Sequence, residues 1–156
     1  MINMHTILVA IDLSDLSETV MDYARSLATV WKARLLVAHV VHDLSYFTGM
    51  YVTGVPLAEF QQRLEDEARE RLDDLCQTTL ADAVPYETLV RTGRPAIELN
   101  LIIREYEVDC LIIGAHSTDK PEHQLFGSTA QWILHQPTCP VFMIPPHRSS
   151  EFVSRG

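Results

Sequence analysis

The sequence predicts an α/β protein in which helices cover both faces of a doubly wound, five-stranded parallel β-sheet. Short apolar runs, typical of strands buried on both faces, alternate along the chain with segments whose apolar residues recur every three or four positions. Such alternation forms right-handed βαβ units. The 156 residues suit one domain. We expect it to span 1–146 and to be followed by a short polar tail, 147–156.

Five segments are expected to form the strands. Four are continuous apolar runs, and the other alternates between apolar and polar residues, as a half-exposed edge strand does. In chain order they are Thr6–Asp12, Arg34–Val41, the alternating Tyr86–Arg91, Asp109–Gly114 and Cys139–Ile144. Because ligands bind beyond the carboxyl ends of the strands in sheets of this class, candidate site residues should follow these segments.

The first helix should follow Asp12. Ser14 is its expected N-cap and Ser17 the alternative, because a serine hydroxyl can accept from the free amides of the first helical turn. Apolar residues spaced three or four apart should form one face of this helix. They are Leu16, Val20, Tyr23, Leu27 and Trp31.

Three more helices are expected. The most regular runs from Pro56 to about Leu80 and carries acidic and basic residues four apart on its outer side, a spacing that favours ion pairs. These pairs are Glu65 with Arg69 and Glu67 with Arg71. Another helix should begin at Pro95, and a short one should run from Gly127 to about His135. The apolar residues of the Pro95 helix are Ile97, Leu101 and Ile102.

The charge balance restricts the possible partners. The formal net charge is −9 and the isoelectric point is near 5.1. A nucleic-acid binder needs a basic face that displaces counterions, and an anionic membrane surface would repel this charge. The sequence also lacks the run of about 18 apolar residues that spans a bilayer, and a signal-peptide pattern. We therefore expect a cytoplasmic protein without nucleic-acid or membrane partners.

The cysteines and histidines form no metal or redox motif. Cys76, Cys110 and Cys139 are widely spaced and include no C-x-x-C pair. Cys110 and Cys139 each open an apolar stretch, so we expect them in the core, where a free cysteine packs as a small hydrophobe. His39 lies inside an apolar strand, and we expect it to be a core or boundary residue.

The end of the fourth strand is the most informative segment. Gly114-Ala-His-Ser117 is followed, after nine residues, by Gly127-Ser-Thr129 at the start of a helix. Glycines at these places let backbone amides approach an anion, which the helix dipole also favours. On spacing alone, two glycines in a loop are more often turn residues than part of an anion site. A P-loop is excluded, because it would need G-x4-G-K-[ST].

This segment resembles the universal stress proteins. The ATP-binding members of that family carry G-x2-G-x9-G-[ST] after the fourth strand, and Gly114, Ser117, Gly127 and Ser128 stand at that spacing. Other matching motifs cover nearly the whole chain: Ile7–Asp12 with Ser14, Leu35–Val40, Gly93-Arg-Pro95, Asp109–Gly114 and Thr138–Val141. The resemblance implies an adenine-nucleotide alpha-hydrolase-like fold with strand order 3-2-1-4-5, a site between the first and fourth strand ends, and a homodimer formed partly by the last strand.

The resemblance also implies a site for ATP or another adenine nucleotide, with or without Mg²⁺. Asp12 resembles the acid near the base and ribose, and Val40 the residue whose backbone recognises the adenine edge. The remaining residues of the implied site are Gly114, His116, Ser117, Gly127, Ser128 and Thr129. Asp12 has an alternative interpretation as a helix N-cap or turn acid. The loop aromatics Tyr46, Phe47 and Tyr51 should cover the core, or alternatively cap an adenine ring or a dimer interface.

Ser117 departs from the family pattern, which has a glycine there. If its backbone must be left-handed, serine costs about 1 to 2 kcal/mol, and the loop also carries the acids Asp119 and Glu122 opposite Lys120. Weak ATP binding, a preference for a less charged adenine nucleotide and no nucleotide binding all stay open. We expect a regulatory protein that hydrolyses ATP slowly at most, since no general base is evident. The alternative is a homodimeric interaction protein with a degenerate pocket.

Overall fold

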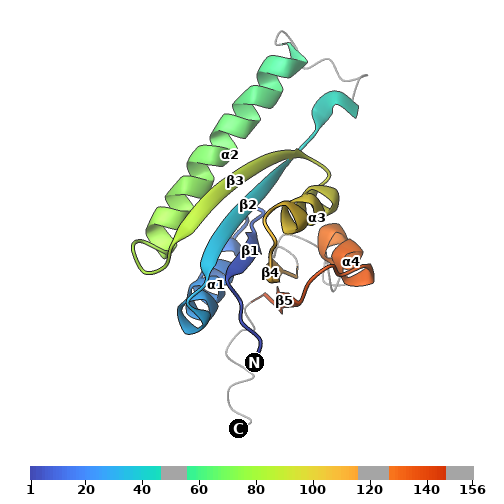
Figure 1. Ribbon diagram of the computed structural model, residues 1–156. Coiled ribbons are helices and arrows are strands. Elements are labelled where there is room, and N and C mark those ends of the chain that lie inside the picture. The colour runs from blue at the N-terminus through green and yellow to red at the C-terminus, as the bar shows by residue number, and fades with distance from the viewer. Residues whose placement is uncertain (47–55, 116–126, 147–156) are drawn as a thin grey trace.

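The computed structural model describes residues 1–46, 56–115 and 127–146, and the predicted α/β architecture is confirmed within them. Five parallel strands form one sheet in the order β3-β2-β1-β4-β5 (Figure 1). The elements are β1 (Thr6–Ala10), α1 (Ser17–Trp31), β2 (Arg34–His42), the 3-10 helix η1 (Leu44–Tyr46), α2 (Leu57–Thr79), β3 (Tyr86–Gly93), α3 (Pro95–Glu105), β4 (Cys110–Gly114), α4 (Ser128–His135) and β5 (Val141–Ile144). The predicted edge strand, β3, lies at an edge of the sheet.

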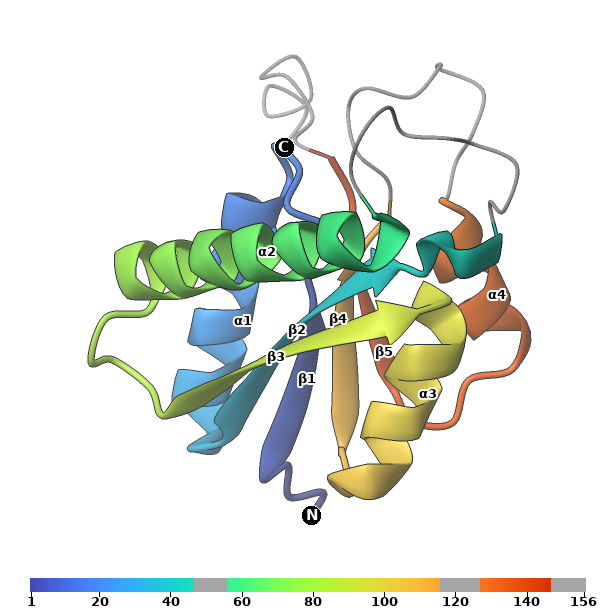
Figure 2. The same cartoon turned by 90° about the horizontal axis from the view of Figure 1, so that it is seen from above.

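Parallel pairing brings the carboxyl ends of the strands to one edge of the sheet. β1 is central, with Thr6 opposite Arg34 on β2 and Ile7 opposite Cys110 on β4. Figure 2 shows the strong twist of the sheet, in which β2 and β3 are rotated away from β4 and β5. Because β1 lies between β2 and β4, the residues that follow these three strands are neighbours.

The side chains of the strands alternate between two hydrophobic cores. Ile7 and Val9 point to the face covered by α1 and α2. Leu8 and Leu36 point to the face covered by α3 and α4. Both faces of the central strands are therefore buried, which explains why their sequences are continuously apolar.

The first helix begins at Ser17, between the starts that the two predicted caps imply. Its N-cap position is Leu16, and no side chain caps it by a hydrogen bond, so the assignment of Ser14 or Ser17 as the cap is wrong. The Ser14 hydroxyl accepts from the Leu16 amide at 3.3 Å, but Leu16 precedes the first helical residue, so this bond does not cap the helix. Ser17 is the first helical residue, and its hydroxyl donates to Asp12. A turn between β1 and α1 therefore uses the groups that were expected to cap the helix.

The apolar face of α1 is also rotated from the predicted one. Val20 is buried as expected, but Tyr23 is 51% exposed. Met21, Ala24 and Ala28 are buried instead. Leu16 is buried, and Leu27 and Trp31 pack at the margin of the core. Small alanine side chains let the helix approach the sheet closely, whereas apolar spacing alone selected the larger residues.

Helix α3 shows the same kind of shift. Ile102 is buried, but Ile97 is 43% and Leu101 48% exposed. The core contacts come from Ile102 with its neighbours Leu99 and Ile103. The position of the helix was therefore predicted correctly, but its buried face is rotated away from Ile97 and Leu101.

Two charged residues of the predicted α2 pairs, Glu65 and Arg71, contact other elements instead. The predicted pairs of Glu65 with Arg69 and of Glu67 with Arg71 do not form. Glu65 accepts from the Thr92 hydroxyl at 2.6 Å, and Arg69 lies 3.7 Å from Asp66. The guanidinium of Arg71 donates to the carbonyl of Leu13 at 3.0 Å. Tertiary neighbours thus replaced the expected partners of Glu65 and Arg71, whereas Arg63 pairs with Glu59 within the helix at 2.7 Å.

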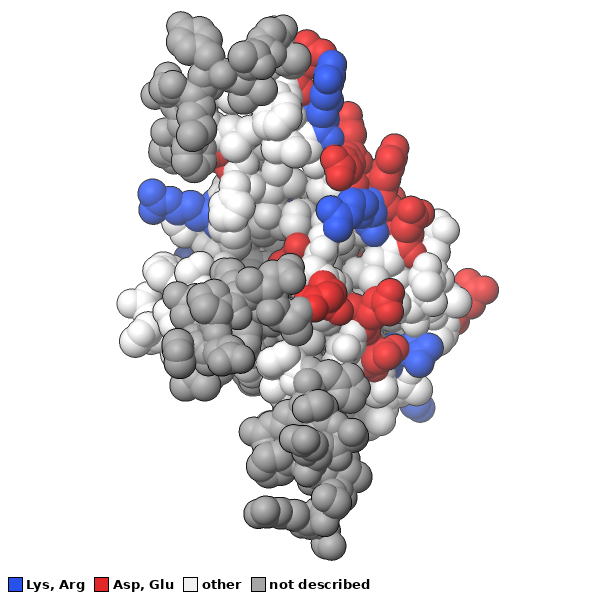
Figure 3. Space-filling model, turned by 180° about the vertical axis from the view of Figure 1, so that it is seen from behind, with Lys and Arg blue, Asp and Glu red and all other residues white. Residues whose placement is uncertain are grey.

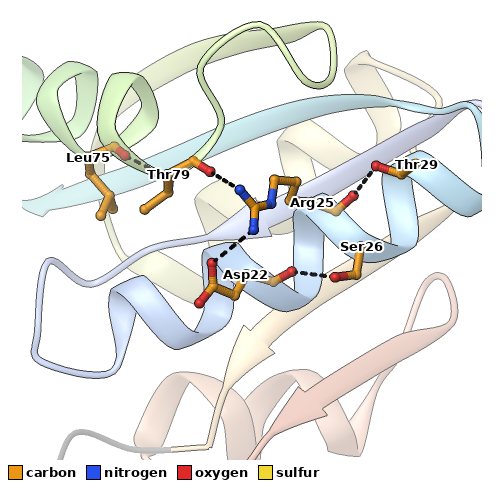
Figure 4. A network of polar contacts seen from close by, with 6 residues as sticks. All are labelled: Asp22, Arg25, Ser26, Thr29, Leu75 and Thr79. Atoms are coloured by element: carbon orange, nitrogen blue, oxygen red, sulfur yellow. Dashed lines mark hydrogen bonds and ion pairs between the residues drawn. The ribbon is translucent and has the colours of Figure 1, made fainter.

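Helices α1 and α2 are joined at the carboxyl end of α2 (Figure 4). Arg25 on α1 donates to the carbonyl of Thr79 at 3.2 Å and lies 3.8 Å from Asp22. The Thr79 hydroxyl donates to the carbonyl of Leu75 at 2.7 Å. A cation at this position satisfies a free carbonyl and complements the negative end of the helix dipole.

Candidate functional site

A cavity of about 570 Å³ opens at the carboxyl edge of the sheet. Its walls come from the ends of β1, β2 and β4, from α2 and from the start of α4. Six of the predicted site residues line it: Asp12, Val40, Gly114, Gly127, Ser128 and Thr129. His116 and Ser117 lie outside the described residues, as do the loop acids, Phe47, Tyr51, the side chain of Tyr46 and the tail at 147–156. A cavity of this size can hold a small-molecule ligand.

Asp12 belongs to the turn that follows β1. Its Oδ1 accepts from the Ser14 amide at 3.0 Å and from the Ser17 hydroxyl at 3.4 Å. Asp12 therefore is a turn acid, the alternative that the sequence left open. Both contacts use the same carboxylate oxygen, and Asp12 is exposed and lines the cavity. The structural contacts are thus compatible with a ligand contact at Oδ2.

Gly114 has a packing role that its motif did not reveal. A Cβ added to this residue would lie 2.8 Å from Cδ2 of Leu16 and 3.4 Å from Cγ2 of Val20. The start of α1 therefore packs directly against the end of β4. The glycine is explained by this contact even without an anion near its backbone.

Gly127 has a different environment. Its φ of −66° and ψ of 161° suit any residue. An added Cβ would lie 3.6 Å from the Ala115 carbonyl oxygen, an ordinary contact and the nearest one among the described residues. Neither backbone strain nor packing in the described chain requires a glycine here, and Gly127 faces the cavity.

The start of α4 brings backbone donors to the cavity. The Gln131 amide donates to the carbonyl of Gly127, so the amides of Ser128, Thr129 and Ala130 precede the first internal hydrogen bond of the helix. Among the described residues, no side chain caps this end. All three residues line the cavity. Free amides at the positive end of a helix dipole favour an anionic group.

His39 lies at the boundary of the core, as expected, and also lines the cavity. Its Nδ1 is 2.7 Å from the carbonyl oxygen of Ile11. A carbonyl can only accept, so Nδ1 carries the hydrogen. Burial lowers the pKa of His39, and this effect exceeds the opposing effects of the Ile11 carbonyl and the Asp12 carboxylate. The ring is therefore neutral at pH 7, and it anchors the residue that precedes Asp12.

Helix α2 supplies a wall that the sequence analysis missed. Leu64, Glu67, Ala68 and Arg71 line the cavity. The helical period placed the charged members of this set on an outer face, and no local signal indicated that this face approaches the turn after β1. The link between Arg71 and Leu13 joins residues 58 positions apart, so only the folded chain could reveal it.

The charges near the cavity are mixed. Among its described lining residues, Asp12 and Glu67 are acidic and Arg71 is basic. Figure 3 shows acidic side chains, with basic ones between them, along the side of the molecule where α2 lies. An anionic ligand would thus depend mainly on the α4 amides, since the described side chains provide little net positive charge.

The described residues provide no evident metal site or membrane segment. Within 1–46, 56–115 and 127–146, no group of three or more His, Cys, Asp or Glu side chains could hold a metal ion. No helix in those ranges is long and apolar enough to cross a membrane.

Cys110 is buried as predicted, and Cys139 packs at the margin of a core.

Solved structures of similar fold include proteins with bound nucleotides. A universal stress protein in complex with cAMP aligns with a TM-score of 0.60 and 21% identity over 92% of this chain and 98% of that chain. A universal stress protein family protein from Arabidopsis thaliana with AMP bound aligns with a TM-score of 0.61 and 14% identity over 94% and 97%. At these identities the similarity concerns the fold.

Sequence comparison establishes the relationship. A model of the Universal stress protein family matches residues 3–145. Universal stress protein A homolog 1 of Coxiella burnetii is 33% identical over 141 residues, which cover 88% of this chain and 94% of that protein. The structure of the universal stress protein UspA from Lactobacillus plantarum aligns with a TM-score of 0.69 and 25% identity over 92% of this chain and 99% of that chain. The chain therefore belongs to the universal stress protein family.

Proposed function

We propose that this protein binds an adenine nucleotide in the cavity at the carboxyl edge of the sheet and acts as a cytoplasmic regulatory protein of the stress response. One observation carries the proposal: the free amides of α4 and the strand-end residues Asp12 and Val40 line the same cavity. The cAMP and AMP complexes of proteins with this fold support the choice of ligand. Hydrolysis of ATP would be slow at most, because the proposed site contains no assigned general base.

The two ends of the cavity suit the two ends of a nucleotide. At the strand ends, Oδ2 of Asp12 can accept from ribose hydroxyls, and the backbone of Val40 can pair with the adenine edge. At the start of α4, the Ser128 and Thr129 amides and hydroxyls can donate to phosphate oxygens. Gly114 connects the two ends, and the proposed phosphate loop continues through His116 and Ser117.

The number of phosphates is the less constrained part of the proposal. Two carboxylates and one guanidinium line the described cavity, and the sequence adds Asp119 and Glu122 to the loop. Their negative charge opposes a triphosphate more than a monophosphate. Mg²⁺, where it accompanies ATP, would reduce this repulsion through the phosphates that it binds.

Isothermal titration calorimetry with adenosine, AMP, ADP and ATP, with and without Mg²⁺, tests the proposal. Protein freed of co-purified nucleotide should bind at least one adenine nucleotide more tightly than adenosine, because only a phosphate can use the α4 amides. Guanine nucleotides are the control for recognition of the base. Absence of binding at millimolar concentration of every adenine nucleotide would reject the proposed function.

As a second proposal, the protein forms a homodimer through β5. The same dimer is the basis of the alternative function, an interaction protein that binds no nucleotide. β5 pairs with β4 and is an edge of the sheet. Phe142 on this strand is 38% exposed, and its ring stands edge-on to that of Trp31 at 5.9 Å. An edge strand with exposed apolar side chains favours association. Light scattering should give twice the chain mass, and a monomer at micromolar concentration would exclude this dimer.

A further inference from the structure

Arg71 connects α2 to the turn that follows β1. Its Nη2 donates to the carbonyl oxygen of Leu13 at 3.0 Å. Both residues line the cavity. Leu13 directly follows Asp12, so the guanidinium holds the backbone beside the carboxylate that is proposed to meet the ribose.

The turn at Leu13 has a conformation that needs support. Leu13 has a φ of +58°, a left-handed backbone that leucine rarely adopts. Three contacts surround it, one from α2, one from β2 and one within the turn itself. Arg71 binds the Leu13 carbonyl, Asp12 accepts from the Ser14 amide at 3.0 Å, and His39 holds the Ile11 carbonyl at 2.7 Å. Of these, the Arg71 contact acts on Leu13 itself.

The position of Arg71 separates it from the proposed phosphate end. Arg71 is on α2, which packs on one face of the sheet, whereas the α4 amides belong to the opposite face. Among the described lining residues Arg71 is the single Lys or Arg. It also lies near His39 and Asp12, since both Arg71 and Asp12 influence the protonation of that histidine.

We propose that Arg71 is a positioning residue for the nucleoside end of the site, an inference that rests on the proposed nucleotide binding. Its hydrogen bond to Leu13 holds the turn in the conformation that presents Asp12 to the ribose. Because Arg71 acts on the turn and not on the phosphates, its loss should lower the affinities for adenosine, AMP and ATP by the same factor.

The test compares Arg71→Met, Arg71→Lys and a matched control, Arg69→Met. Arg69 is on the same helix, exposed, and 3.7 Å from Asp66, so its substitution removes a similar charge away from the cavity. Calorimetry should show that Arg71→Met lowers the affinity for every adenine ligand by about fivefold to tenfold, the effect of losing one typical intramolecular hydrogen bond. Arg71→Lys, which keeps a charged donor, should recover part of this loss, and Arg69→Met should bind like the parent protein.

Amide hydrogen exchange gives a readout that needs no ligand. The Ser14 and Leu16 amides are bonded within the turn. They should exchange about tenfold faster in Arg71→Met than in the parent and in Arg69→Met, while α1 and β1 are unchanged.

Three results would overturn the positioning role. Unchanged exchange of the turn amides would do so even if the parent binds no nucleotide, which would separately reject the proposed function. A loss of affinity that increases from adenosine to ATP would indicate instead that Arg71 contacts the phosphates directly. Equal affinity of Arg71→Met and the parent for all three ligands would likewise contradict the inference.

Discussion

Gly114 at the end of β4 and Gly127 at the start of α4 belong to one motif, yet they have different surroundings. A Cβ on Gly114 would come within 2.8 Å of Leu16, whereas a Cβ on Gly127 would make one ordinary contact at 3.6 Å with a described residue. The first glycine is explained by the packing of Leu16, at the start of α1, against the end of β4. The described residues do not require the second glycine, and the proposed phosphate site offers a reason for it. If that proposal holds, the two glycines of the motif serve stability and binding separately.

Gly114→Ala should have the largest effect. The added methyl group must displace Leu16 in a packed core, and such overpacking costs about 1 to 3 kcal/mol of the free energy of unfolding. Urea unfolding followed by circular dichroism measures this loss. Shortening the neighbour in the double variant Gly114→Ala/Leu16→Ala should make the added cost of the alanine at 114 smaller than it is next to Leu16. An unchanged free energy of unfolding in Gly114→Ala would remove the packing explanation.

Gly127→Ala should preserve stability and reduce binding. The backbone there is already compatible with alanine, so the free energy of unfolding should stay within about 0.5 kcal/mol. The methyl group would stand beside the α4 amides and weaken phosphate contacts, lowering the affinity for AMP or ATP by about tenfold, the value of one charge-assisted hydrogen bond. Adenosine, measured in the same calorimeter, is the control and should bind as it does to the parent. A variant with parental affinity for every nucleotide would show that Gly127 does not approach the phosphates.

His39 lines the same cavity on the side of the strand ends. Its substitution should have the smallest effect of the three, a change in how the free energy of unfolding depends on pH. Burial lowers its pKa below the ordinary 6.5, so the unfolded chain takes up the proton more readily. The contribution of His39 to stability is therefore complete above pH 6.5 and decreases as the pH falls through 6.5 toward the lowered pKa.

Urea unfolding at several pH values from about 7.5 to 5 checks this direction. His39→Gln does not titrate at this position and should lose part of the acid-side decrease in the free energy of unfolding, while the other six histidines are present in both proteins. Asp12, Arg71 and His42 face His39, so Asp12→Asn should lower the pKa of the ring further. A pH dependence identical in His39→Gln and the parent would show that this histidine is not perturbed by burial.

The elements of the fold and the edge of the sheet that holds the cavity were predictable because they depend on local patterns. Continuous apolar runs marked the buried strands β1, β2 and β4, and alternation marked the edge strand β3. The motif from Gly114 to Thr129 and its resemblance to a known family indicated the edge of the sheet at which the cavity lies. Order along the chain and the chirality of βαβ units then left few possible topologies.

Tertiary structure alone decided which neighbours these residues have. The Glu65 carboxylate accepts from the Thr92 hydroxyl, and the Arg71 guanidinium donates to the backbone carbonyl of Leu13. The local pattern had predicted partners for both residues within α2. Gly114 is explained by Leu16, nearly a hundred positions earlier in the chain. Periodicity in a sequence records which side of an element is apolar. It carries no information on which distant side chain or carbonyl will face a given group, because those distances are set when the helices pack on the twisted sheet.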